Sequence, residues 1–127
     1  MKKAIALLLA LVMVFALCAC GGGDKGTADN GEKGVKIGVF EPASGDSGAG
    51  GKKEMLGMQY ANQETPTVEI GGETYKVELV YSDNGSDSGK AVSAASKLVN
   101  EKVSLVLGSY GSGVSIAASD TFKQAGI

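Results

Sequence analysis

The sequence predicts an α/β fold, a sandwich in which helices cover the faces of a mostly parallel sheet. From Val35 onward, short runs of apolar residues alternate with longer segments whose apolar residues recur at helical spacing. Loops rich in glycine, serine and aspartate separate the two kinds of segment. Strands that alternate with helices are typical of βαβ units, in which neighbouring strands run parallel and the crossovers are right-handed.

The first strand is predicted over 35–40, where Val-Lys-Ile-Gly-Val-Phe is mainly apolar and is ended by Pro42. A glycine-rich loop over 43–51 follows it. The first helix is predicted over about 52–63, although Gly57 weakens it. Its expected inward face consists of Met55, Leu56, Tyr60 and Gln63.

A hairpin is predicted next, because the turn Gly71-Gly72 separates a short strand over 67–70 from a longer one over 75–81. The loop 82–88 closes this strand, and Asp87 or Ser88 is available as the N-cap of the second helix. That helix has the clearest periodicity of the chain. Its apolar positions are Ala91, Val92, Ala95, Leu98 and Val99.

A strand of the buried type is predicted over 103–107, followed by a turn over 108–111 and a third helix over 112–124. Gly126-Ile127 resembles the beginning of another strand. The residues expected to face inward from the third helix are Val114, Ala117, Ala118, Thr121 and Phe122.

The N-terminal residues have the pattern of an export signal: Lys2 and Lys3 precede an uninterrupted apolar run that is too short to span a bilayer comfortably. Its ending, Leu-Cys-Ala-Cys, resembles the lipobox of bacterial lipoproteins, with Cys20 as the acylated residue. An ordinary secreted protein cut after Ala19 is the alternative. The predicted organisation is therefore a signal peptide over 1–19, a lipidated Cys20 with a flexible glycine-rich tether over 20–34, and a folded domain over 35–127.

Composition excludes several classes of function. Loss of Lys2 and Lys3 from the twelve lysines leaves ten cations against fourteen acids, a net charge of −4, which argues against nucleic acid as a partner. The chain contains no histidine, and once Cys20 is lipidated and Cys18 removed no cysteine remains for a disulfide or a metal site. These absences argue against hydrolases of the Ser-His type and against zinc enzymes, and they leave open a site built from carboxylates alone. We expect no catalytic residues, no metal and no cofactor.

Ligands of parallel α/β sheets bind beyond the carboxyl ends of the strands, which draws attention to the loops 41–51, 82–88 and 108–112. The last of these precedes a helix, whose free N–H groups and dipole attract anions, and Ser112 adds a hydroxyl donor. The sequence leaves open whether Ser112 binds a ligand carboxylate or only caps its own helix. The first loop lacks the spacing of a phosphate-binding loop, and Asp83 and Asp87 lack the glutamate of an EF-hand, which favours turn and capping roles for them.

The arrangement resembles the amino-terminal lobe of type I periplasmic binding proteins, and in particular the branched-chain amino acid (Leu/Ile/Val) receptors of ABC importers. The order and spacing of several segments carry this resemblance, although no single motif is specific. The segments are Val35 to Val39, Pro42 to Gly45, Gly57, Tyr75 to Asp83, Lys90 to Val92, Lys97 to Val99 and Val106 to Gly113.

The resemblance implies a ligand site around Ser112, whose hydroxyl and backbone N–H would bind the ligand carboxylate, with Tyr110 and Gly111 lining the pocket. Ser44, in the first ligand-side loop, is a weaker candidate. Gly50 stands near a position where several members of the family have a pocket tyrosine, so this sequence departs from the pattern there. The side-chain preference for the ligand is therefore left open.

The same resemblance implies two lobes that close on a ligand and present it to the permease subunits of an ABC transporter. Members of the family continue into a second lobe, so we expect 35–127 to be an incomplete N-terminal lobe of a longer, lipid-anchored extracytoplasmic receptor. The expected ligand is a Leu-, Ile- or Val-like amino acid. The alternatives are a receptor for another small polar solute such as an amide, urea or another amino acid, a lipid-anchored enzyme, and a short structural lipoprotein that truly ends at Ile127.

Overall fold

The computed structural model describes residues 33–127, so the predicted signal peptide, Cys20 and nearly all of the predicted tether lie outside the described residues. Four strands and three helices follow one another along this part of the chain. They are β1 (Gly34–Phe40), α2 (Gly48–Glu64), β2 (Thr67–Ile70), β3 (Glu73–Tyr81), α3 (Ser88–Asn100), β4 (Leu105–Gly108) and α4 (Ser112–Ala125).

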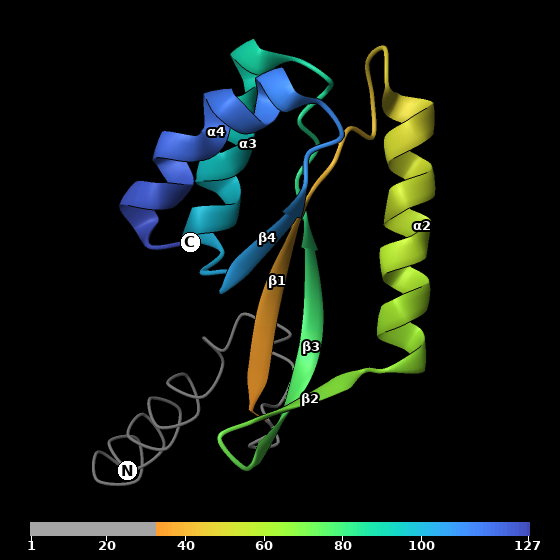
Figure 1. Cartoon of the computed structure of the whole chain (residues 1–127), viewed down its shortest axis with the longest axis vertical. Coiled ribbons are helices and arrows are strands. Elements are labelled where there is room, and N and C mark those ends of the chain that lie inside the picture. Colours follow the sequence, from red (N-terminus) through yellow and green to blue (C-terminus); the bar gives the residue numbers. More distant parts are fainter. Residues whose placement is uncertain (1–32) are drawn as a thin grey trace, which may run out of the picture. The chain divides into compact units, whose positions relative to one another are not determined.

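The strands form one sheet in the order β2-β3-β1-β4, and β1 pairs in parallel with both β3 and β4. Ile37 of β1 stands opposite Leu79 on one side and Leu105 on the other. β2 is the short antiparallel strand of the predicted hairpin. Helix α2 lies on one face of the sheet, and α3 and α4 lie together on the other (Figure 1). The predicted α/β class with a mostly parallel sheet is confirmed.

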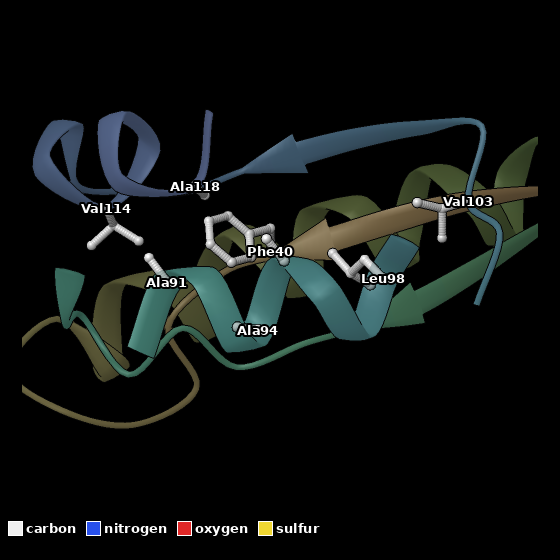
Figure 2. Close-up of a cluster of buried hydrophobic side chains, with 8 residues drawn as sticks. Phe40, Ala91, Ala94, Leu98, Val103, Val114 and Ala118 are labelled. Atoms are coloured by element: carbon white, nitrogen blue, oxygen red, sulfur yellow. The ribbon is translucent and has the colours of Figure 1, made fainter. Parts of the chain in front are cut away.

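The hydrophobic core lies between the sheet and the pair α3 and α4 (Figure 2). Phe40 at the end of β1 is its largest buried side chain, and its ring meets the edge of Phe122 from α4 at a centroid distance of 5.4 Å. Small residues on α3 allow this helix to approach the sheet closely, which is why alanine supplies much of the core. The cluster consists of Phe40, Ala91, Ala94, Ala95, Leu98, Val103, Val114 and Ala118.

The second predicted helix agrees with α3 in position and cap. Asp87 is the N-cap, and its carboxylate accepts a hydrogen bond from the Gly89 N–H at 2.7 Å. The buried face is shifted by a fraction of a turn from the predicted one: Ala94 joins it, whereas Val92 is half exposed. At the end of α4, Gly126 is a left-handed C-cap rather than the predicted beginning of a strand, and Ile127 packs against the core.

The prediction for the first helix was wrong in its start and in its inward face. α2 begins at Gly48, inside the segment predicted as a loop, because Gly48 and Gly51 allow its first turn to pass directly over the backbone of Ala43 and Pro42. Leu56 and Tyr60, both predicted to face inward, are each 64% exposed. The face toward the sheet is a different one, formed by Glu54, Gly57, Met58, Ala61 and Asn62.

The two faces of the sheet differ in how well they are packed. Between α2 and the sheet lies a cavity of about 770 Å³, lined mainly by apolar side chains such as Ile37, Leu79 and Leu107. Leu105 and Leu107 on the edge strand β4 remain substantially exposed. The buried core thus belongs to the α3 and α4 face. None of the helices within 33–127 combines the length and the apolar character needed to cross a bilayer.

Candidate functional site

A second cavity, of about 460 Å³, lies at the end of the sheet to which the arrows of β1 and β4 point (Figure 1). Glu41 lines it directly after β1, Glu54 and Met58 line it from α2, and the segment 107–112 lines it together with Ser115 of α4. Its place beyond the carboxyl ends of parallel strands is where ligands of such sheets bind. It is smaller and far more polar in its lining than the cavity beneath α2.

The N-terminus of α4 opens into this second cavity. Gly111 is the N-cap, and its carbonyl accepts hydrogen bonds from the N–H groups of Val114 and Ser115 at 3.0 and 3.1 Å. Ser112 is the first residue of the helix and not its cap, and its hydroxyl has no side-chain hydrogen bond among the described residues. The N–H groups of Ser112 and Gly113 have no acceptor within the helix, so this end of α4 offers donors to an anion.

Ser109 stabilises the turn that leads into α4 through hydrogen bonds of its hydroxyl. Its hydroxyl lies 3.0 Å from the Gly111 carbonyl oxygen and 2.7 Å from the Ser115 hydroxyl. The turn itself requires Gly108, whose φ of +132° is a conformation that L side chains rarely adopt. A Cβ atom on Gly108 would lie 2.3 Å from the Phe40 carbonyl oxygen. The turn therefore presses directly against the end of β1.

Tyr110 reaches across the site to α2. A Cβ atom on Gly50 would lie 2.6 Å from two ring atoms of Tyr110 and from its hydroxyl oxygen, so the Tyr110 side chain packs on the bare backbone of the first turn of α2. Gly50, noted above as a departure from the family pattern, therefore lacks a side chain where the Tyr110 side chain packs against it. Tyr110 remains more than half exposed and forms part of the cavity wall.

Asn84 holds the three loops of the site together. It is fully buried, and its side-chain amide donates to the carbonyl oxygens of Phe40 at 3.0 Å and Ser109 at 3.3 Å. Its side-chain oxygen accepts from the Ser86 N–H at 3.0 Å, and its own N–H donates to the Glu41 carbonyl. One side chain therefore joins the loops that follow β1, β3 and β4.

Ser44 is not brought to the cavity and instead ties two loops to each other. Its hydroxyl donates to an Asp83 carboxylate oxygen at 2.6 Å, and the N–H groups of Ala43 and Gly85 donate to the other oxygen, each at 2.8 Å. Burial alone would raise the pKa of Asp83, but these hydrogen bonds favour the charged form and lower the pKa below its ordinary value. The predicted turn role of Asp83 is confirmed.

Glu41 is the most unusual side chain of the site. It is only 1% exposed, and its Oε2 has no hydrogen-bond partner among the described residues. Burial raises the pKa of Glu41 to about 7, and the charge of Glu54 and a hydrogen bond with it add to the increase. The group is therefore divided between its neutral and charged forms near neutral pH.

The structure brings Ser112, Gly111 and Tyr110 together at one cavity, and their role in ligand binding stays a prediction. Sequence reasoning did not single out Glu41, which lines the same cavity, or Asn84, which joins the loops around it. Glu41 carried a weak signal, because a glutamate that directly follows an apolar strand is unusual in a loop rich in small residues. Asn84 carried none, since asparagine is common in turns. Within 33–127 no cluster of three or more acidic, cysteine or histidine side chains is arranged to hold a metal ion.

A known family matches nearly all of the residues that the structure describes. The model of a family described as periplasmic binding protein matches residues 34–127. The chain belongs to the periplasmic binding protein family. Its fold is that of part of a type I periplasmic binding protein, which confirms the predicted resemblance. The family is one of substrate-binding proteins.

Relatives of this periplasmic binding protein include receptors named for branched-chain amino acids. The Leu/Ile/Val-binding protein homolog 2 of Brucella abortus is 33% identical over 93 residues, which are 73% of this chain and 25% of the relative. A branched-chain amino acid transporter substrate-binding protein from Streptococcus pneumoniae, solved in complex with isoleucine, is 33% identical with a TM-score of 0.65, and the match covers 75% of this chain and 27% of that one.

A solute-binding protein of an ABC transporter from R. palustris, solved in complex with benzoate, is 27% identical with a TM-score of 0.63. That match covers 74% of this chain and 26% of the other. The chain thus spans about a quarter of the length of the relatives it matches. Members of this fold with similar identity bind an amino acid in one case and an aromatic acid in the other.

Proposed function

We propose that this chain is the amino-terminal ligand-binding part of an extracytoplasmic receptor that captures a branched-chain or related amino acid for an ABC importer. The observation that carries the proposal is the N-terminus of α4, where Ser112 presents an unused hydroxyl and the first free N–H groups of the helix to a cavity at the carboxyl ends of the strands. The amino-acid receptors among the relatives support the choice of ligand class.

In this proposal the protein binds its solute without chemical change and passes it to permease subunits. The ligand carboxylate lies at Ser112, where a charge-assisted hydrogen bond contributes about 1.5–3 kcal/mol. Gly111 and Tyr110 shape the wall beside it. Ser44 acts indirectly, because its hydroxyl is engaged by Asp83 and holds the first loop in place.

Replacement of Ser112 by alanine should weaken the binding of L-isoleucine by about 1–3 kcal/mol, because one donor to the carboxylate is lost. The complete encoded protein is titrated with L-isoleucine by calorimetry. Ser119→Ala is the matched control, since Ser119 lies on the same helix and its hydroxyl donates to the Ile116 carbonyl at 2.8 Å. Equal affinities of the Ser112→Ala variant and the parent would contradict the assigned role.

We also propose that the receptor is anchored to the cell membrane by a lipid on Cys20, after removal of residues 1–19. The apolar run and the lipobox-like ending of the sequence support this. An acyl anchor would tether the folded part near the permease through the glycine-rich segment that precedes β1.

Replacement of Cys20 by serine should abolish incorporation of radiolabelled palmitate and release the protein from the membrane fraction. Cys18→Ser is the matched control, because this cysteine lies two residues earlier and is expected to leave with the signal peptide. Fractionation and fatty-acid labelling of both variants check the prediction. Membrane retention of the Cys20→Ser variant with its label intact would show that the anchor lies elsewhere.

A further inference from the structure

The loop after β3 contains a dipeptide, Asn84-Gly85, that is prone to a spontaneous reaction. When glycine follows asparagine, no side chain hinders the approach of the glycine nitrogen to the asparagine amide, and the amide is readily lost. Two of the four asparagines of the chain are followed by glycine, and both stand in the tripeptide Asp-Asn-Gly, at 29–31 and at 83–85. The first tripeptide lies in the predicted tether, outside the described residues, and the second lies beside the cavity loops.

The structure engages both reacting groups in other interactions. The backbone N–H of Gly85 donates to Asp83 Oδ1 at 2.8 Å. The Asn84 amide is fully buried: Nδ2 donates to two backbone carbonyls, at 3.0 and 3.3 Å, and Oδ1 accepts from a backbone N–H at 3.0 Å. For reaction, the Gly85 nitrogen must lose its proton and bond to the amide carbon while Nδ2 leaves. Neither change can occur while these hydrogen bonds are kept.

Asp83 holds the Gly85 N–H without activating it. The same carboxylate accepts the Ser44 hydroxyl at 2.6 Å and the Ala43 N–H at 2.8 Å, and such hydrogen bonds lower the pKa of Asp83. A carboxylate of low pKa is a poor base, so it keeps the N–H as a donor and does not take its proton. The loop after β1, which supplies Ala43 and Ser44, therefore helps to keep Gly85 unreactive.

The product of the reaction does not fit the position of Asn84. Aspartate there would present a carboxylate oxygen, in place of the donor Nδ2, to the carbonyl oxygens of Phe40 and Ser109. A buried charge that faces two acceptors is costly in free energy. Isoaspartate, the other product, also lengthens the backbone by a methylene group. Neither product can restore the contacts that join the three loops.

We propose that Asn84-Gly85 is a spontaneous deamidation site that stays closed while the loops after β1, β3 and β4 are joined, and whose reaction separates these loops irreversibly. An opening of the loops frees the amide and the nitrogen together. The reaction then prevents that molecule from returning to its original structure. This inference concerns the fold around the cavity and does not depend on which solute the cavity binds.

The reaction consumes only water. The Gly85 nitrogen forms a bond to Cγ of Asn84, the bond from Cγ to Nδ2 breaks, and ammonia leaves with the proton that the Gly85 nitrogen gives up. Water then opens the resulting succinimide ring. Hydrolysis at Cγ yields aspartate, and hydrolysis at the backbone carbonyl yields isoaspartate, in which the chain continues through the side chain. In total, an amide and water become a carboxyl group and ammonia, without oxidation or reduction.

The first test is the rate of deamidation at Asn84 in the folded and unfolded protein. The complete encoded protein and a free peptide of residues 77–90 are incubated at mildly alkaline pH, in buffer and in urea above the unfolding midpoint. Trypsin cleaves after lysine, so Asn30 and Asn84 are recovered in separate peptides, 26–33 and 77–90, for mass spectrometry. Asn84 should react at least about tenfold more slowly in the folded protein than in the free peptide, and as fast as the peptide in urea.

Ser44→Ala tests whether the loop contacts close the site. The variant loses a hydrogen bond to Asp83 but keeps the tripeptide 83–85, so Asn84 should react at least about fivefold faster than in the parent. Asn30 in the same molecules should react at an unchanged rate. Ser96→Ala is the matched control, because its hydroxyl donates to the Val92 carbonyl within α3 at 2.8 Å. Both asparagines of that variant should react as in the parent.

The second test asks whether the reacted protein regains its stability. Molecules deamidated at Asn84 in urea are separated by anion exchange, since each gains a negative charge, and are returned to buffer. They should unfold at a lower urea concentration than untreated protein, and the encoded Asn84→Asp variant is the standard for the aspartate product. Molecules deamidated only at Asn30 gain the same charge and should match the untreated protein.

Three results would overturn the proposal. The first is an Asn84 that reacts as fast in the folded protein as in the free peptide. The second is a rate at Asn84 that Ser44→Ala leaves unchanged, and the third is full recovery of stability after deamidation at Asn84. None of these measurements uses a ligand, so such a result would leave the proposed function standing. A failure of amino acids to bind would likewise leave this inference standing.

Discussion

Replacing Gly108 by alanine should destabilise the protein by at least about 3 kcal/mol and disrupt the proposed ligand site. The added Cβ would lie 2.3 Å from the Phe40 carbonyl oxygen and 3.0 Å from Glu41 Oε1, in a backbone conformation with φ +132°. The first contact cannot be relieved by a side-chain rotation, because the Phe40 carbonyl belongs to the backbone. Urea unfolding of the complete encoded protein and titration with L-isoleucine measure both losses.

Gly57→Ala is the matched control for this substitution. Gly57 lies inside α2, and a Cβ atom there would meet no other atom within 4 Å. Alanine should stabilise the helix by up to about 1 kcal/mol, since it reduces the entropy of the unfolded chain. A Gly108→Ala protein that unfolds at the same urea concentration as the parent would contradict the close packing of the turn against β1.

Asn84→Ala should cost about 2–5 kcal/mol of stability, because it removes three side-chain hydrogen bonds from a fully buried position. The carbonyl oxygens of Phe40 and Ser109 would lose their donor, and the loops after β1, β3 and β4 would lose the group that joins them. We expect ligand affinity to fall as well, although Asn84 is not among the residues that line the cavity. Urea unfolding and L-isoleucine titration of the complete encoded protein check both effects.

Asn100→Ala provides the comparison, since Asn100 is exposed at the end of α3 and should change stability by less than about 0.5 kcal/mol. Asn84→Asp is a second useful variant: it keeps the size and the acceptor but removes the two donated hydrogen bonds. It should be as damaging as alanine. If Asn84→Asp retained full stability, the donated bonds to Phe40 and Ser109 would not be what holds the loops together.

The parts of the fold that the sequence predicted well are those where burial and periodicity agree. α3 packs on the core with a helical repeat of small apolar residues, so its position, N-cap and most of its inward face were predictable. α2 contradicts its own pattern, because its largest apolar side chains, Leu56 and Tyr60, point away from the sheet. The start of α2 could not be predicted for another reason. Gly48 and Gly51 allow the helix to lie close to the backbone of the preceding loop, and helix propensity does not register such a long-range contact.

The candidate site was predictable where it depends on backbone geometry and not where it depends on long-range contacts. The N-terminus of α4 follows from a strand, a glycine-rich turn and a helix in succession, so Ser112 could be placed from the sequence. Asn84 and Glu41 gain their significance from partners more than ten residues away: the carbonyls of Phe40 and Ser109 for the first, and Glu54 for the second. Such pairs exist only after the sheet has brought the loops together.

The central claim is that the cavity at the carboxyl ends of the strands holds an amino acid with its carboxylate at the N-terminus of α4. A crystal structure of the complete encoded protein with L-isoleucine tests this most directly. We predict that the carboxylate lies within hydrogen-bond distance of the Ser112 hydroxyl and N–H. An isoleucine bound elsewhere, with Ser112 and Gly111 free of contact to its carboxylate, would contradict the account.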